Sequence, residues 1–485
     1  MVCGLFLSAF LLRKLGATDY GVYQTIASFA NCLVLLEFGV GTVMARNISM
    51  CQGRGASQEE LHQNISTLWV VTNVLVLVLV GASLIFNALI EIAFAGTLTN
   101  AQINDAHRLM LFISLHLIFS FYIQTVDGII LAYENYSYGS IQKIIKTILR
   151  TALMIVLVQV FHTSLVVAVV DAGVSLLLLG FALWYCRRKL AVKLTVRKFS
   201  YTVFRNSAPL CLALFMQTVV NQVNSNADKF IIGIMMGPEE VALYSVGMYV
   251  YSIFSSLTTI PISFYAPRIA QQMSRGKVMA DIHGELVGAG RLIATVGGLA
   301  LFGFVAVGKQ FISLVYGEEY LFAWVIAVIL MVPMYLNMCT GVLVNVLDVL
   351  NKRIVRSCVL IITTMCNIVL TVFWIQSQGM LGAALATAVC VLVGQTIVMF
   401  IYYSKVLGVK MRRLLKDILG GNLIALLLAT VVSYLIGQWI KAVLLSFLVG
   451  GIVFVAVFGA VFFLWGAEQN EREIIRAVIK RRAKC

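Results

Sequence analysis

Apolar stretches of about 20 residues recur from one end of this 485-residue chain to the other, and a helix of that length crosses the ~30 Å hydrocarbon layer of a membrane. The composition agrees, because 61% of the residues are hydrophobic and only 12% are charged, whereas about a quarter of the residues in soluble domains are charged. Strands of a membrane barrel would instead alternate apolar and polar residues over roughly ten positions. We therefore predict an all-α integral membrane protein.

The apolar stretches predict about fourteen transmembrane helices. The first is incomplete, since the stretch before Arg13 supplies only about 17 Å of helix at 1.5 Å per residue, which indicates that Met1 is not the natural start or that the chain is a fragment. The predicted spans are 2–12, 20–44, 68–94, 109–132, 144–161, 165–186, 209–236, 241–266, 292–315, 322–349, 359–375, 381–403, 418–436 and 443–465.

A sequence repeat divides these helices into two halves. The decapeptides LGATDYGVYQ (15–24) and MGPEEVALYS (236–245) share a pattern of Gly, acid, small residue and Tyr at an offset of 221 residues. Two further pairs, VMARNI with YAPRIA and LAYENYSYGSIQK with LDVLNKRIVR, follow in the same order. Because each half holds an even number of spans, both halves cross the membrane in the same direction, as in a parallel repeat. The predicted division is a six-helix bundle at 1–200, a second at 201–408, two extra helices at 409–466 and a basic tail at 467–485.

Each decapeptide predicts a hairpin at the outer face of the membrane. Gly16 and Gly237 permit tight turns that other residues resist, and Asp19 and Glu240 stand at the start of the following helix, where a carboxylate is favoured. We expect the two hairpins to be mainly structural corners that frame opposite sides of an outer gate.

Basic residues fall in alternate joints, and such joints are retained in the cytoplasm. Examples are the joints that contain Arg46, Lys143, Arg188 and Arg413, and the tail REIIRAVIKRRAKC. Both termini are therefore predicted to be cytoplasmic, although Arg13 and Lys14 would lie at the outer surface. This topology and anionic membrane lipids account for the formal net charge of +15, so nucleic-acid binding is not predicted.

Polar side chains form stripes along several predicted helices. Gln217, Asn221, Asn224 and Asp228 recur at steps of three or four residues and share one helix face, and such a face must contact protein or water. Hydrogen bonding between helices is the commonest use of a single Asn or Ser. An ionisable group inside the membrane more often marks a transport pathway. The ionisable candidates are Glu37, Asp127, Asp171, Asp228 and Lys229.

The cysteines and histidines indicate no metal site. The ten Cys lie mostly in apolar stretches, the five His are scattered, and the sequence holds no CxxC pair. We interpret the Cys as small packing residues.

The segments LLRKLGATDYGVYQ, FGVGTVMAR and NADKFIIGIMMGPEEVALYSVGMYVYSIFSSLTTIPISFYAPRIAQ resemble the polysaccharide-unit flippases of the multidrug/oligosaccharidyl-lipid/polysaccharide exporter superfamily. The ADKFIIG…VALYSV block is the most specific part. The resemblance implies a transporter, not an enzyme, that carries undecaprenyl-pyrophosphate-linked oligosaccharide across a bacterial inner membrane for O-antigen, lipopolysaccharide or capsule assembly. It also implies the lipid-linked oligosaccharide and membrane lipids as partners, with a polysaccharide polymerase and chain-length proteins as further candidates.

Such a substrate requires neutral hydrogen-bonding groups for sugar hydroxyls and cations for the pyrophosphate. No cofactor is predicted. Asp127 and Asp228 are candidates to hold a coupling proton or sodium ion, or to balance the basic groups. The predicted substrate-binding residues are Lys229, Arg13, Lys14, Gln217, Asn221, Asn224, Gln124, Asn31 and Tyr249.

Two other functions are compatible with parts of this pattern. A cation-coupled multidrug exporter of the same superfamily would share the architecture, and only its substrate would distinguish it. A membrane-embedded polysaccharide polymerase or acyltransferase would be expected to present a large extramembrane loop or a catalytic constellation, and the joints here are short.

Overall fold

The computed structural model describes residues 2–466 apart from 191, 193, 197, 276–278, 280 and 351. Throughout this part of the chain the regular structure is helical and no strand is present, so the predicted all-α membrane fold is confirmed. The predicted basic tail at 467–485 lies outside the described residues.

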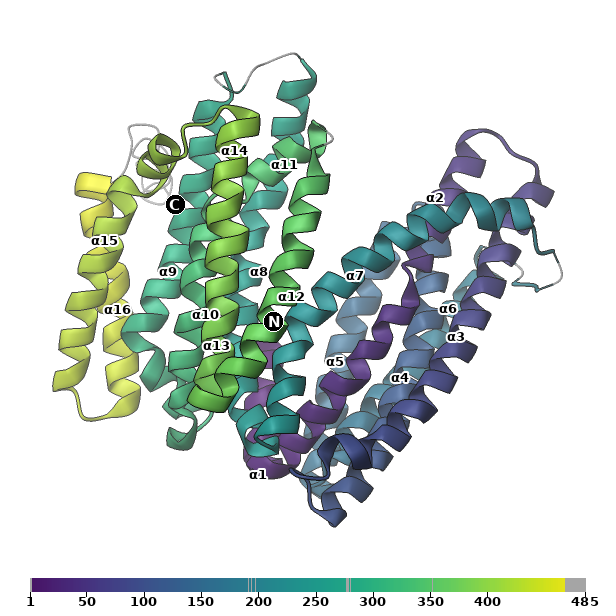
Figure 1. Ribbon diagram of the computed structural model, residues 1–485, viewed down its shortest axis with the longest axis horizontal. Coiled ribbons are helices and arrows are strands. Elements are labelled where there is room, and N and C mark those ends of the chain that lie inside the picture. The colour runs from purple at the N-terminus through teal and green to yellow at the C-terminus, as the bar shows by residue number, and fades with distance from the viewer. Residues whose placement is uncertain are drawn as a thin grey trace, which may run out of the picture. The chain divides into compact units, whose positions relative to one another are not determined.

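The chain divides into two units, Met1–Ala242 and Leu243–Cys485. The helices of the first unit are α1 (Val2–Asn31), the short 3-10 helix η1 (Cys32–Glu37), α2 (Val40–Gly53), α3 (Gln58–Phe94), α4 (Asn100–Ala132), α5 (Tyr136–Phe161), α6 (Leu165–Arg188) and α7 (Tyr201–Met235) (Figure 1).

Helix α8 (Pro238–Ser274) begins in the first unit and continues into the second. In the second unit, α15 and α16 pack against each other and against α9. The remaining elements are α9 (His283–Val315), η2 (Glu318–Tyr320), α10 (Phe322–Cys339), α11 (Val342–Val349), α12 (Arg353–Gln378), α13 (Met380–Cys390), η3 (Val391–Val398), α14 (Met399–Leu407), α15 (Met411–Trp439), α16 (Val443–Val461) and η4 (Phe462–Gly466).

Helix α7 packs against α1, η1 and α3 and so belongs to the first unit. The boundary predicted after residue 200 assigned this helix to the second bundle, and the observed boundary falls one helix later. The sequence repeat marks equivalent helices but does not say which neighbours each helix packs against.

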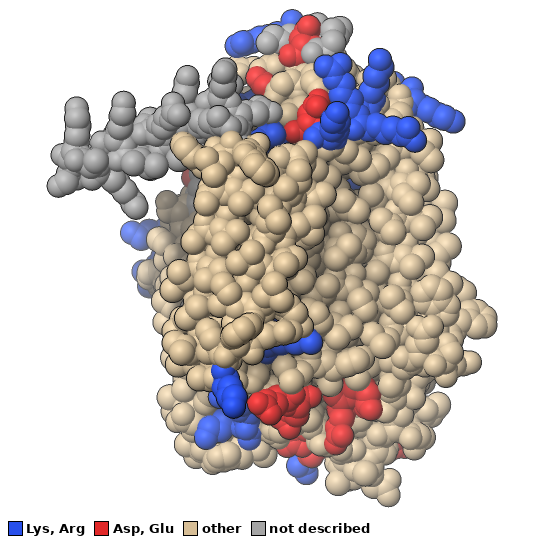
Figure 2. All heavy atoms as spheres, turned by 90° about the vertical axis from the view of Figure 1, so that its left-hand side faces the viewer, with Lys and Arg blue, Asp and Glu red and all other residues tan. Residues whose placement is uncertain are grey.

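The described residues contain twelve helices long and apolar enough to cross a membrane, or thirteen if the bent helix α7 counts as one span. The predicted count of about fourteen is therefore not confirmed. The stretches predicted at 2–12 and 20–44 fall within one candidate span, Gly4–Gly53, although the backbone at Gly16 inside it is not helical (φ +80°, ψ +169°). On the face shown in Figure 2, a wide uncharged band separates charged residues gathered at the two ends, as expected for a surface in contact with hydrocarbon.

Helix α4 is fixed at both ends of its course through the first unit. At its start, Thr99 and Gln102 form a reciprocal capping box that satisfies free backbone N–H groups. Further along, α4 crosses α2 at two glycines: a Cβ atom on Gly128 would lie 2.1 Å from the Gly41 carbonyl oxygen. Only glycine permits this approach of two backbones, and the contact sets the position of the neighbouring residues Gln124 and Asp127.

Both predicted turns are present, since Gly16 has φ +80° and Gly237 has φ +113°. The two decapeptides also touch. The Thr18 hydroxyl donates to Glu239 Oε1 at 3.0 Å, and these two residues are separated by the repeat offset of 221. A Cβ atom on Gly21 would lie 1.9 Å from the Pro238 carbonyl oxygen.

This tight packing holds the first turn of α8 against α1, and both glycine turns lie in the first unit. That the two hairpins frame opposite sides of an outer gate stays a prediction. The change from one unit to the other occurs inside α8, after Ala242.

Candidate functional site

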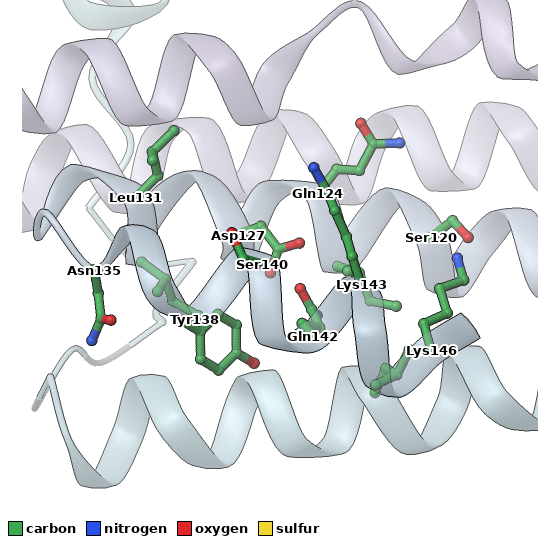
Figure 3. Close-up of a pocket in the computed structure, with 14 residues that line it drawn as sticks. Ser120, Gln124, Asp127, Leu131, Asn135, Tyr138, Ser140, Gln142, Lys143 and Lys146 are labelled. Carbon is green, nitrogen blue, oxygen red and sulfur yellow. The ribbon is translucent and has the colours of Figure 1, made fainter. Parts of the chain in front are cut away.

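A polar cavity of about 430 Å³ lies between α4 and α5 in the first unit (Figure 3). Most ligand pockets in proteins have volumes of roughly 300–1,000 Å³, so the cavity is large enough for a small polar group. The lining residues are Ser120, Ile123, Gln124, Asp127, Ile130, Leu131, Asn135, Tyr138, Gly139, Ser140, Gln142, Lys143, Lys146 and Leu178.

The N-terminus of α5 forms one end of this cavity. The chain leaves α4 through Glu134, which has φ +59°, and Asn135 precedes the first helical residue without capping it. The Asn135 side chain instead donates to the Tyr185 hydroxyl on α6. The first turn of α5 contains no acidic residue, so the partial positive charge of this helix end is not neutralised there.

The single carboxylate of the cavity lining, Asp127, is already engaged. With the Gln142 amide oriented to place its nitrogen towards α4, Gln142 donates to both Asp127 carboxylate oxygens at 3.1 and 3.0 Å. Gln142 is buried, so this pairing fixes α5 against α4 at the level of the carboxylate.

Two lysines of α5 extend from that helix towards α4. In Figure 3, Lys143 reaches towards Gln124, and Lys146 reaches towards Ser120. Within the described part of the chain, neither amine forms an ion pair. The cavity therefore carries two unpaired cations and one carboxylate.

Two hydroxyl groups of the lining also have no partner. Among the described residues, the oxygens of Tyr138 and Ser120 are buried without a hydrogen bond, and Tyr138 as a whole is only 8% exposed. A buried hydroxyl without a partner is costly, so both groups are available to a ligand or to water.

One helical step beyond Lys146, a polar network joins α5 to three other helices. Arg150 pairs with Asp171 of α6 through two contacts, Nε to Oδ1 at 2.5 Å and Nη2 to Oδ2 at 3.0 Å. The Tyr23 hydroxyl donates to Asp171 Oδ2 at 3.5 Å. His116 Nδ1 lies 3.0 Å from the Asp171 carbonyl oxygen and 2.8 Å from Ser175 Oγ.

The structure brings two of the predicted site residues to the cavity, Asp127 and Gln124. Gln124 also donates to Glu37 Oε2 at 2.9 Å, which links the cavity rim to η1. The remaining predicted residues lie elsewhere. On α1, Arg13 and Lys14 are exposed and Asn31, at the end of the helix, is half-buried. On α7, Asn221 is exposed, Asn224 and Lys229 are half-buried and Asp228 is buried, and Tyr249 is half-buried on α8 in the second unit. The side chain of Gln217 lies outside the described residues.

Gln142 is not among the predicted site residues, and Lys143 is predicted only as part of a cytoplasmic joint, because the predicted span begins at residue 144. Helix α5 in fact begins at Tyr136. The steps of three and four residues that separate Lys143, Lys146 and Arg150 could have indicated a polar helix face. No group of His, Cys, Asp and Glu suited to a metal ion is found among the described residues.

The profile of the family described as "Polysaccharide biosynthesis protein" matches residues 4–273, which is more than half of the chain. A search of curated proteins finds no match.

Among solved structures, "Lipid II flippase MurJ, inward closed conformation" is similar with a TM-score of 0.69 and 16% identity over 95% of this chain and 96% of that chain. An inward-facing multidrug resistance MATE family transporter of the MOP superfamily has a TM-score of 0.65 and 13% identity over 84% and 94%. The MATE multidrug transporter DinF-BH has a TM-score of 0.58 and 15% identity over 84% and 92%. At these identities, the similarity establishes the fold.

Proposed function

Because the chain belongs to the polysaccharide biosynthesis protein family, we propose that it is a flippase for lipid-linked oligosaccharides. Its substrate is an oligosaccharide on undecaprenyl pyrophosphate, which it moves across the bacterial inner membrane for the assembly of O-antigen or capsule. The family match over residues 4–273 carries this proposal. The fold shared with a lipid II flippase supports it, since that protein also acts on a lipid-linked substrate.

The chemistry of the cavity is compatible with this substrate. Gln124, Asn135 and Ser120 offer neutral donors and acceptors for hydroxyl groups. Lys143 and Lys146 offer positive charge for a diphosphate. The proposal also includes movement by alternating access, both termini in the cytoplasm, and coupling to protons or sodium through Asp127 or Asp228. It includes a polysaccharide polymerase and chain-length proteins as partners.

A multidrug exporter is the second candidate, because two MATE transporters share the fold. The charge of the cavity argues against it for cationic drugs. Two unpaired lysines repel a cation in a low-dielectric site, and the one carboxylate is already bonded to Gln142.

Gene replacement tests the proposed function. We expect the protein to restore surface polysaccharide in at least one of a panel of strains that each lack a flippase for a defined glycan. Drug susceptibility should stay unchanged in a strain without multidrug exporters. Raised drug resistance with no glycan restored, at normal protein levels in the membrane, would favour the multidrug exporter instead.

A further inference from the structure

We propose that the cavity between α4 and α5 binds the diphosphate of the lipid-linked substrate, with Lys143 and Lys146 as its cationic ligands. This inference deepens the proposed function and rests on it for the identity of the substrate. The residues predicted from the sequence to bind the diphosphate, Lys229, Arg13 and Lys14, do not line this cavity.

The balance of charges favours an anion. The lining carries two lysines and one aspartate, and Gln142 already satisfies both oxygens of that aspartate. The lysine amines, by contrast, form no ion pair within the described part of the chain. Unpaired amines in a partly enclosed cavity attract a phosphate oxygen more strongly than amines in bulk water do.

The start of α5 adds a second attraction. Tyr138, Gly139 and Ser140 of its first turns line the cavity. Asn135 gives this helix end no side-chain cap, and its first turn contains no acidic residue. Free backbone amides and the helix dipole stabilise a bound anion at such a position. Both lysines belong to the same helix as these first turns and line the same cavity.

The unpartnered hydroxyl groups are the third observation. The oxygens of Tyr138 and Ser120 are buried without a hydrogen bond among the described residues. Each hydroxyl can donate one hydrogen bond to a phosphate oxygen. A diphosphate supplies several acceptors at once, which distinguishes it from an apolar ligand.

Arg150 is not part of this ligand set. Its guanidinium is held by Asp171 through two contacts. The next basic residues along α5, Lys146 and Lys143, are therefore the groups available to the ligand.

Protection of lysines from acylation measures binding without any transport. The purified full-length protein in neutral detergent is treated with an amine-reactive reagent, with and without inorganic pyrophosphate, and modified peptides are quantified by mass spectrometry. We expect pyrophosphate to slow modification of Lys143 and Lys146 at least about threefold and to leave Lys198, which pairs with Glu59 on the surface, unchanged. Equal rates with and without pyrophosphate would overturn the proposal.

Variants that change the charge of the cavity test whether it favours an anion. The Lys143→Gln/Lys146→Gln variant is expected to bind pyrophosphate about tenfold or more weakly. The matched variant Lys189→Gln/Lys198→Gln, which removes the same charge from exposed positions of the same unit, should bind like the wild type. Asp127→Asn removes the competing negative charge, so it should bind about threefold or more tightly. If both double lysine variants lost the same amount of pyrophosphate affinity, the effect would come from net charge alone, and the proposed site would be wrong.

Two lipids that carry phosphate must be distinguished. In nanodiscs of neutral lipid, undecaprenyl pyrophosphate is expected to protect the two lysines at a lower mole fraction than phosphatidylglycerol does. Equal protection would mean that the lysines contact ordinary lipid headgroups, and the proposal would be wrong.

The proposed function can fail separately. If pyrophosphate protects the lysines but no strain of the glycan panel is restored, the anion site stands and the flippase assignment fails. If glycan is restored equally well by the Lys143→Gln/Lys146→Gln variant and by the wild type, the flippase assignment stands and this site is not the diphosphate subsite.

Discussion

Asp171→Leu alone is expected to destabilise the folded protein by about 3 kcal/mol. The substitution leaves the guanidinium of Arg150, a side chain that is 35% exposed, without the carboxylate that binds it through two contacts. It also removes the acceptor of the Tyr23 hydroxyl. An uncompensated charge among membrane helices is costly. The measurement is the thermal unfolding midpoint in detergent, together with the amount of folded protein in the membrane.

The double variant Arg150→Leu/Asp171→Leu is the informative companion, because it removes both charges. It should recover most of the lost stability, as apolar replacements of buried ion pairs generally do. Glu59→Gln breaks the exposed pair with Lys198 and serves as the matched control, for which little change is expected. If the loss of stability in the double variant equalled the sum of the losses in the two single variants, the two charges would not stabilise each other.

If the two decapeptides separate when the transporter opens outward, a covalent link between residues 18 and 239 is expected to reduce glycan export at least about tenfold. Thr18 and Glu239 form a hydrogen bond at 3.0 Å, so a Thr18→Cys/Glu239→Cys variant without other reactive thiols can be joined by a short thiol-specific cross-linker. Export is measured before cross-linking, after it, and after cleavage of the link by reductant, which should restore activity.

The surface pair Glu59 and Lys198 provides the control for this experiment. Its side chains lie 2.9 Å apart in the same unit, and linking Glu59→Cys to Lys198→Cys with the same reagent should leave export intact. If the 18–239 link forms in full and export continues, the hairpins do not separate during transport.

The fold was largely predictable because the membrane imposes a simple rule: apolar segments of about 20 residues must be helices. The turns at Gly16 and Gly237 were also predictable, since their positive φ angles favour glycine. The packing of α7 was not, because repeat spacing carries no information about which helices are neighbours. The span count depends on whether the non-helical backbone at Gly16 inside α1 separates two spans, which no hydropathy pattern reveals.

The candidate site was predictable only on one of its two walls. Asp127 and Gln124 stood out because they interrupt an apolar stretch, and α4 does place them at the cavity. Lys143 and Lys146 were hidden because basic residues beside an apolar stretch normally mark a cytoplasmic joint. Helix α5 begins at Tyr136, well before its predicted start at residue 144. This extension brings Lys143 into the same helix as Lys146, which already lay inside the predicted span, and the two form the second wall.

Translocation in reconstituted vesicles tests the central claim most directly. Undecaprenyl-pyrophosphate-linked oligosaccharide is distributed over both leaflets of proteoliposomes, and a glycosidase added outside digests only the sugar that reaches the outer leaflet. With the purified protein, and with the proton or sodium gradient set in either direction, we expect the inner-leaflet pool to become fully digestible, whereas protein-free vesicles keep it protected. A pool that stays protected in vesicles containing folded protein would contradict the assignment of this chain as a flippase for lipid-linked oligosaccharides.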